Sequence, residues 1–174
     1  MLCIDVSGSM HGKRIREAVR GAEQFVMEAV EARYKVGVML WNTRVTDLAE
    51  PTSDGKGAMK LLGRTSSAAG GNNLIGPLDH CHQVLDRFKD APDRVVALFG
   101  DGDLTPKGPV LRKVAQMKAE NIRFVTRGLG THAAAEFGEI SSEEPSSASI
   151  DDVAKLADGI ATMAASLKMK RPRG

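Results

Sequence analysis

Short apolar segments alternate with longer amphipathic ones along the whole chain. The apolar segments lie at 1–5, 34–41, 93–100 and 122–128, and they have the length and composition of strands buried in a parallel sheet. Between them, apolar residues recur at spacings of three and four, which is the periodicity of a helix with one buried face. This alternation predicts an α/β fold whose mostly parallel central sheet is covered by helices on both faces.

The helices are predicted at residues 12–32, 73–88, 109–120, 133–140 and 151–167, with one further short helix around Met59 in a long loop. Residues 45–48 are predicted to form an antiparallel edge strand, because a tight Asn42-Thr43 turn joins them to the strand before. We therefore expect one domain over residues 1–167, followed by a basic tail at 168–174.

The composition is that of a soluble domain without an obvious nucleic-acid or membrane partner. The 174 residues are 42% hydrophobic and 26% charged, which is ordinary, and only 4% aromatic, so the core must be mostly aliphatic. A formal net charge of +2 is too small to indicate nucleic-acid binding. No apolar run approaches the roughly 18 residues that a membrane helix requires.

Two observations favour a cytoplasmic location. No basic segment followed by an apolar one opens the chain, so no signal peptide is predicted unless the chain has been trimmed at its start. The two cysteines, Cys3 and Cys81, give neither a disulfide framework nor the spacing of a metal site. Both are expected to be small buried hydrophobic residues.

Two carboxylates follow strands of the predicted sheet. Asp5 ends the first strand, and Asp101 follows the strand at 93–100. The carboxyl ends of parallel strands lie at one edge of the sheet, where the ligands of such folds bind. Ser7 and Ser9 come shortly after Asp5, in a glycine-containing loop before a helix. Carboxylates and hydroxyls from several loops suit a hard cation such as Mg²⁺ or Mn²⁺.

Three loops carry the polar residues of this edge. They read Asp5-Val6-Ser7-Gly8-Ser9-Met10, Gly70-Gly71-Asn72-Asn73-Leu74 and Asp101-Gly102. In order and spacing they resemble the three loops of the metal-ion-dependent adhesion site in the von Willebrand factor type A domain family, and the alternation of elements extends the resemblance over nearly the whole chain. The resemblance implies a Rossmann-like three-layer sandwich. It also implies a Mg²⁺ or Mn²⁺ site formed by Asp5, Ser7, Ser9, Asp101 and Asn72, with no catalytic residue.

Two positions depart from the family's pattern. The second loop has Asn72 where the family has threonine, and the third has Gly100 before Asp101 where threonine is more usual. An asparagine carbonyl oxygen can ligate a hard cation but cannot donate as a hydroxyl does. Because threonine ligation typifies the ligand-engaged state of the family, metal binding is the firmer expectation and tight, switchable adhesion the weaker one. Gly100 is expected to loosen the strand end or to let another group approach the backbone.

Simpler roles stay open for the same loops. The first could cap the helix that follows it, Asp101-Gly102 could form a turn, and Asn72 or Asn73 could cap the next helix. A cysteine–histidine metal site at residues 80–82 is rejected, because helical neighbours one and two apart point in different directions.

A phosphatase or a response-regulator receiver would also place an aspartate at a strand end beside Mg²⁺. The phosphatase loop carries a second aspartate two residues later, where this chain has Ser7, and serine cannot replace that general acid. The acidic pair and the late lysine of a receiver are not visible either. An Mg²⁺-dependent phosphatase is therefore the least favoured class.

The sequence thus predicts a non-enzymatic, Mg²⁺-dependent protein-interaction domain. The ion would bind an Asp or Glu carboxylate of a partner protein, and rim loops around His11, Ala68-Ala69 and Leu104-Thr105 would set specificity. Two alternatives stay open. One is an accessory role beside an AAA+ ATPase or chelatase-type machine, as the family resemblance allows, and the other is a scaffold with a degenerate metal site.

Overall fold

A six-stranded sheet forms the centre of the computed structural model, which describes residues 1–144 and 149–168. The strand order is β3-β2-β1-β4-β5-β6, and all neighbours are parallel except β2 and β3. The strands are β1 (Leu2–Asp5), β2 (Val36–Trp41), β3 (Val45–Thr52), β4 (Arg94–Gly100), β5 (Ile122–Leu129) and β6 (Ser149–Ile150). The predicted sandwich with one antiparallel edge strand is confirmed.

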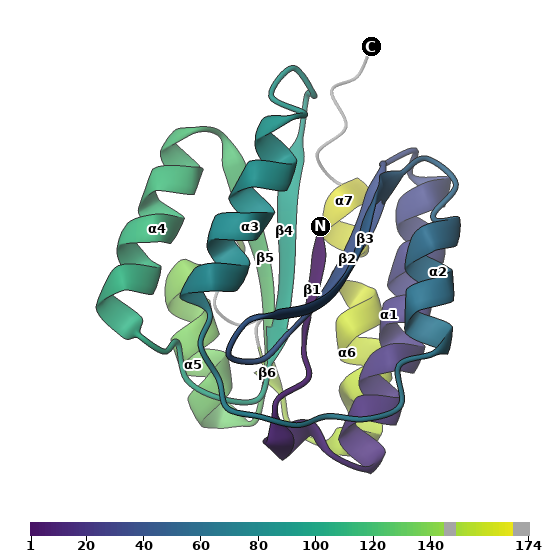
Figure 1. The fold of residues 1–174 in the computed structure, drawn as a ribbon, viewed down its shortest axis with the longest axis vertical. Helices are drawn as coiled ribbons and strands as arrows, with labels where there is room; N and C mark the ends of the chain where they lie inside the picture. Colours follow the sequence, from purple (N-terminus) through teal and green to yellow (C-terminus); the bar gives the residue numbers. More distant parts are fainter. Residues whose placement is uncertain (145–148, 169–174) are drawn as a thin grey trace.

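Helices cover both faces of this sheet (Figure 1). The α-helices are α1 (Lys13–Glu31), α2 (Lys56–Gly63), α3 (Ile75–Asp86), α4 (Lys107–Ala119), α5 (Thr131–Ile140), α6 (Leu156–Thr162) and α7 (Ala165–Lys168), and the short 3₁₀ helices are η1 (Gly8–Met10) and η3 (Val153–Lys155). In Figure 1, α1, α2, α6 and α7 lie on one side of the sheet, and α3, α4 and α5 lie on the other.

The two helical layers enclose two separate hydrophobic cores. Strand side chains alternate between the faces of a sheet, so Leu2 and Ile4 of β1 belong to the core beneath α1 and α6, whereas Cys3 belongs to the core beneath α3 and α4. Cys3 and Cys81 are both buried and free, as expected from the sequence. A strand buried on both faces explains why β1 reads as one continuous apolar run.

Gly21 allows α1 and α6 to approach each other closely. A Cβ atom added at Gly21 would lie 2.4 Å from the carbonyl oxygen of Ala157 in α6, which is far inside van der Waals contact. The backbones of the two helices therefore meet at this point, and α6 is held against the face of α1 that also covers β1 and β2.

The carboxyl-terminal part of the domain differs from the prediction. A single helix at 151–167 was expected, but the chain forms η3, α6 and α7 with a break at Met163 and Ala164. There the backbone bonds run from Met163 to Ile160 and from Ala164 to Ala161, the tighter i to i−3 pattern, and both residues are fully buried.

Two smaller differences concern the strands. β3 extends to Thr52 rather than ending at Leu48, and its Pro51 is accommodated because β3 is an edge strand. β6 was not predicted; it follows the serine-rich passage and pairs with the end of β5. Most of the basic tail expected at 168–174 lies outside the described residues.

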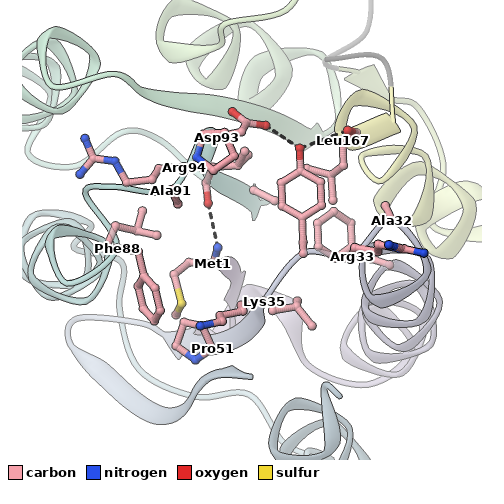
Figure 2. A pocket seen from close by; sticks show the side chains of 18 residues that line it. Met1, Ala32, Arg33, Lys35, Pro51, Phe88, Ala91, Asp93, Arg94 and Leu167 are labelled. Carbon is pink, nitrogen blue, oxygen red and sulfur yellow. Dashed lines mark hydrogen bonds between the residues drawn. The ribbon is translucent and has the colours of Figure 1, made fainter. Parts of the chain in front are cut away.

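An apolar cavity of about 330 Å³ opens at the amino-terminal ends of the central strands (Figure 2). Side chains of α1, α7 and the end of α3 line it, and the amino group of Met1 lies within it and donates a 2.7 Å hydrogen bond to the carbonyl oxygen of Val95. The cavity is at the end of the sheet opposite to Asp5 and Asp101, and neither of them lines it.

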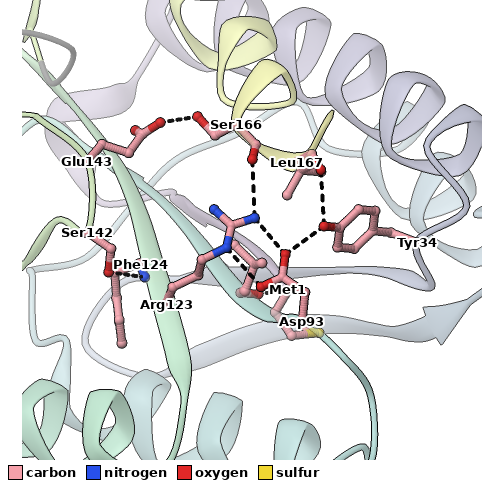
Figure 3. Close-up of polar contacts among 10 residues, drawn as sticks. Met1, Tyr34, Asp93, Arg123, Phe124, Ser142, Glu143, Ser166 and Leu167 are labelled. Carbon is pink, nitrogen blue, oxygen red and sulfur yellow. Dashed lines mark hydrogen bonds and ion pairs between the residues drawn. The ribbon is translucent and has the colours of Figure 1, made fainter. Parts of the chain in front are cut away.

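A polar cluster beside this cavity fastens the carboxyl-terminal helix to the sheet (Figure 3). Arg123 of β5 forms two hydrogen bonds with the carboxylate of Asp93, at 2.8 and 2.6 Å, and donates to the carbonyl oxygen of Ser166 at 3.2 Å. The Tyr34 hydroxyl contacts the same carboxylate at 2.6 Å and the carbonyl oxygen of Leu167 at 3.1 Å. Burial, together with the negative charge of Asp93, raises the pKa of Tyr34 to about 12. The carbonyl groups of Ser166 and Leu167 are thus bound by side chains of two other segments, β5 and the loop before β2.

Candidate metal centre

The first polar loop begins where β1 ends. Asp5 is fully buried, and its Oδ1 atom accepts a 2.7 Å hydrogen bond from the backbone N–H of Ser7. The loop then turns through η1, which places the hydroxyl oxygens of Ser7 and Ser9 3.1 Å apart. Gly12, with φ at +77°, redirects the chain into α1. One carboxylate and two hydroxyls are thus gathered within five residues.

Asp101 joins this group because β1 and β4 are neighbours in the sheet. It follows β4 directly, and its side chain is only 2% exposed. The Oδ1 atom of Asp101 accepts a 2.6 Å hydrogen bond from the Ser9 hydroxyl. The carboxyl end of β4 therefore delivers the second carboxylate of the site to the first loop, as the sequence predicts.

Backbone hydrogen bonds fasten the second loop to the other two. The N–H of Gly8 donates to the carbonyl oxygen of Gly70 at 2.9 Å, and the N–H of Ala69 donates to the carbonyl oxygen of Val6 at 2.8 Å. On its other side, the N–H of Leu74 bonds the carbonyl oxygen of Thr105 in the third loop at 2.8 Å. The three loops form one cross-linked rim, seen at the lower end of the molecule in Figure 1.

Asn72 lies against the third loop. Its Nδ2 atom donates to the carbonyl oxygen of Asp103 at 3.2 Å, and a Cβ atom added at Gly102 would lie 2.6 Å from this nitrogen. Helix α3 is stabilised instead by Asn73, whose side chain accepts from the N–H of Ile75 at 3.2 Å. The asparagine at the family's threonine position is therefore not occupied in capping a helix.

Two oxygen atoms of the candidate ligands have no hydrogen-bond partner among the described residues. They are Asp5 Oδ2 and Asn72 Oδ1, and both are buried. Buried polar oxygens without partners are costly, and a bound cation satisfies them. Burial, with a further contribution from the charge of Asp101, raises the pKa of Asp5 to about 6. The site thus holds a destabilised carboxylate that a positive ion would stabilise.

The donor set fits a hard cation. In the described part of the chain, no three His, Cys, Asp or Glu side chains gather to hold a metal, so the nitrogen and sulfur ligands of a structural zinc site are not assembled. The site offers carboxylate, hydroxyl and amide oxygens instead, which are the ligands of Mg²⁺ and Mn²⁺. Asp5, Ser7, Ser9, Asp101 and Asn72 can therefore hold such an ion.

The simpler roles considered for the first loop do not match the structure. Ser7 is the residue before η1 but makes no side-chain capping hydrogen bond there, and α1 is preceded by Gly12, which has no side chain to cap with.

Gly100, expected to allow a close approach, does so for Phe137: an added Cβ would lie 2.7 Å from its ring. The same Cβ would lie 3.4 Å from Asp5 Oδ2.

One predicted rim residue is wrong. Leu104 is only 1% exposed and belongs to the core beneath α3 and α4, so it cannot contact a partner. An apolar side chain in a polar loop is buried because this removes it from water. His11, Ala69 and Thr105 are exposed and stay candidates for contact.

Sequence reasoning missed Arg14. This residue of the first turn of α1 donates to Asp101 Oδ2 at 2.8 Å and to the carbonyl oxygen of Ser9 at 3.1 Å. A signal was present, since a basic residue in the first turn of a helix is opposed by the positive end of the helix dipole and needs a compensating anion. On the same rim, His132 at the start of α5 contacts Asp103 at 2.6 Å, with both side chains largely exposed.

Comparisons with known proteins define first the fold and then the family. The structure of the von Willebrand factor domain of the pilus tip protein Mfa5 from Porphyromonas gingivalis has a TM-score of 0.82 and 11% identity, with 99% of this chain and 95% of that chain covered. Residues 1–103 match the von Willebrand factor type A domain. The chain therefore belongs to the von Willebrand factor type A domain family. No curated protein sequence gives a significant match.

Two further solved structures of similar fold contain a metal. Proximal thread matrix protein 1 from the mussel byssus, described with a zinc-occupied MIDAS motif, has a TM-score of 0.71 and 17% identity, covering 96% of this chain and 46% of that one. The manganese-loaded TRAP protein of Plasmodium vivax has a TM-score of 0.70 and 17% identity, covering 94% and 71%. At these identities the likeness concerns the fold. In the described residues, no helix is long and apolar enough to span a bilayer.

Proposed function

We propose that this domain binds partner proteins through a divalent cation, Mg²⁺ or Mn²⁺, held at the carboxyl ends of β1 and β4. The observation that carries the proposal is the meeting of Asp5, Ser7, Ser9 and Asp101 at the rim, linked by hydrogen bonds of 2.6 to 3.1 Å. The unpartnered oxygens of Asp5 and Asn72 add to it. When bound, the cation would supply an open coordination position for a carboxylate of the partner.

Each side chain has a distinct part in this proposal. Asp5 and Asp101 supply negative charge, whereas Ser7 and Ser9 supply neutral oxygens that do not cancel the charge of the ion further. The Ser9 hydroxyl also fixes the orientation of Asp101 through the 2.6 Å hydrogen bond. Asn72 contributes a carbonyl oxygen in place of a threonine hydroxyl. With two carboxylates, an ion keeps enough positive character to attract an external acid.

Relatives of the same fold support the choice of a metal-binding role. Two structures with TM-scores of 0.71 and 0.70 contain zinc and manganese, respectively. Because these metals differ, the choice of Mg²⁺ or Mn²⁺ for this chain rests on its own oxygen donors. A partner protein with an acidic residue is the occupant that the open coordination position favours.

We assign no catalytic role to the rim. Asp103, the further carboxylate of the third loop, is paired with His132, and their side chains are 60% and 75% exposed. Such an exposed pair is weak and solvent-screened, unlike the buried, positioned acid or base of a hydrolase. Turnover of a generic phosphate ester with Mg²⁺ would contradict this assignment.

Isothermal titration of the domain with Mg²⁺ and with Mn²⁺ tests the proposal. Wild type should bind one ion, whereas Asp5→Ala should lose the binding heat because it removes a buried carboxylate ligand. Asp103→Ala is the matched control, since it removes a carboxylate from the same rim that the proposal does not use. Identical titrations for wild type and Asp5→Ala would contradict the proposal.

A further inference from the structure

Arg14 contacts the first and third loops of the candidate metal centre. Its Nη1 atom lies 2.8 Å from Asp101 Oδ2 and 3.1 Å from the carbonyl oxygen of Ser9. The two partners differ in exposure: the Arg14 side chain is 43% exposed, whereas that of Asp101 is 2% exposed. The guanidinium therefore reaches from the surface of α1 to a carboxylate that is almost completely buried.

This contact changes the charge that the site offers to a cation. Both oxygens of Asp101 accept hydrogen bonds from the protein, Oδ1 from Ser9 and Oδ2 from Arg14. Asp5 and Asp101 are the two carboxylates of the site, and the positive charge of Arg14 balances one of them. A divalent cation would enter an environment of about one net negative charge instead of two, close to a fixed positive group.

We propose that Arg14 lowers the affinity of this site for a divalent cation and makes cation binding depend on an external carboxylate. The inference rests on the proposed function, since it concerns the same ion. Two positive groups on one small rim repel each other, and an anion that contacts both relieves the repulsion. A partner carboxylate can bind the cation and also accept a hydrogen bond from the exposed part of Arg14. The ligand class is thus an acidic side chain of a partner protein.

Titration with Mg²⁺ at low ionic strength tests whether Arg14 lowers the affinity of the site for the cation. Arg14→Gln keeps most of the side-chain stem but removes the charge, and it should bind Mg²⁺ about three- to tenfold more tightly than wild type. Arg16→Gln is the matched control: it makes the same charge change on an exposed side chain of the same helix, and the affinity should stay unchanged. Arg14→Lys keeps the charge and should stay near wild type. Equal or weaker binding by Arg14→Gln, or Arg14→Lys binding as tightly as Arg14→Gln, overturns the inference.

Sodium acetate serves as the probe for the carboxylate. At matched ionic strength, replacing chloride with acetate should raise the Mg²⁺ affinity of wild type by a larger factor than that of Arg14→Gln. Equal factors in the two proteins overturn the dependence on an external carboxylate.

Thermal unfolding gives a readout that does not depend on partner binding. In EDTA, Arg14→Gln should melt at a lower temperature than wild type, because Asp101 loses its counter-charge. Saturating Mg²⁺ should raise the melting temperature of Arg14→Gln by more than that of wild type. If wild type and Arg14→Gln both lack any response to Mg²⁺, the proposed function and this inference both fail. If wild type responds and the variant responds equally or less, this inference alone fails.

Discussion

Ser9 donates a 2.6 Å hydrogen bond to Asp101, although 92 positions separate them in the chain. The contact exists because β1 and β4 are adjacent parallel strands whose carboxyl ends open side by side. It joins the first and third polar loops, and backbone bonds from Gly8 and Ala69 join the second loop to the first. The strand order therefore brings the residues of the candidate metal centre together, and hydrogen bonds between the loops hold these residues in position.

Asp5→Asn should stabilise the domain in EDTA while abolishing Mg²⁺ binding. The carboxylate of Asp5 is fully buried, and its pKa is raised to about 6, so ionising it in the folded protein is unfavourable. Asparagine has nearly the same shape without the charge. We expect a gain of about 1–3 kcal/mol in the free energy of unfolding at neutral pH, measured by urea denaturation. A loss of stability in the variant would contradict this account of Asp5.

The gain should depend on pH in a defined direction. The pKa of Asp5 is about 6 in the folded protein and near 3.8 in the unfolded chain. Between these values the folded state keeps a proton that the unfolded state has released, so wild type loses stability relative to Asp5→Asn as the pH rises. The difference should be near zero below pH 4 and complete above about pH 6. Urea unfolding in EDTA across this range measures it, and a difference that grows toward low pH would refute the assignment.

Asn72 and Asn73 should separate metal binding from helix stability. Asn72→Ala removes an unpartnered buried oxygen and should weaken Mg²⁺ binding about two- to tenfold with little change in stability. Asn73→Ala removes the side chain that accepts from the N–H of Ile75 and should cost about 1 kcal/mol with unchanged Mg²⁺ affinity. Titration and urea unfolding of both variants provide the comparison. If Asn73→Ala weakened Mg²⁺ binding and Asn72→Ala only lowered stability, the two assignments would be wrong.

Gly21 should tolerate no side chain. Gly21→Ala places a methyl group 2.4 Å from the carbonyl oxygen of Ala157, so α1 and α6 must separate, and we expect a loss of about 1–3 kcal/mol. Gly138→Ala in α5 is the control, because its Cβ would meet nothing within 4 Å. It should leave stability unchanged or raise it by about 0.5–1 kcal/mol through helix propensity. Equal effects of the two changes on stability would show that α1 and α6 can accommodate a methyl group at Gly21.

The polar cluster around Asp93 should respond unequally to two substitutions. Asp93→Ala leaves the Arg123 side chain, which is only 12% exposed, without its carboxylate and should cost about 3 kcal/mol. Tyr34→Phe removes one hydroxyl but keeps the Asp93–Arg123 pair, so about 1 kcal/mol is expected. Urea unfolding of both variants measures the two losses of stability. A larger loss for Tyr34→Phe than for Asp93→Ala would contradict this account.

The sequence was sufficient for β1 to β5 and for the carboxylates at the ends of β1 and β4, but not for β6. β1 and β4 are continuous apolar runs ending next to a polar loop, so both the strands and the placement of Asp5 and Asp101 follow from local pattern. The break at Met163 and Ala164 was not predictable, because neither proline nor glycine marks it in residues 160–168. Leu104 was misplaced on the rim, because its burial depends on core residues that are distant in the chain.

Arg14 marks the limit of sequence reasoning at the site itself. Its partner Asp101 is 87 positions away, and no spacing rule connects a helix side chain with a distant loop. The first-turn position of a basic residue is unusual in electrostatic terms but names no partner. Only the strand order, which brings the loop after β4 to the start of α1, identifies the pair.

The most direct test of the central claim is a crystal structure of the domain soaked with Mn²⁺, with anomalous data collected near the manganese absorption edge. The account predicts one strong anomalous peak at the carboxyl ends of β1 and β4, in contact with Asp5, Ser7 and Ser9, and its loss in Asp5→Ala crystals. An occupied manganese site elsewhere on the surface with no peak at this rim would contradict it.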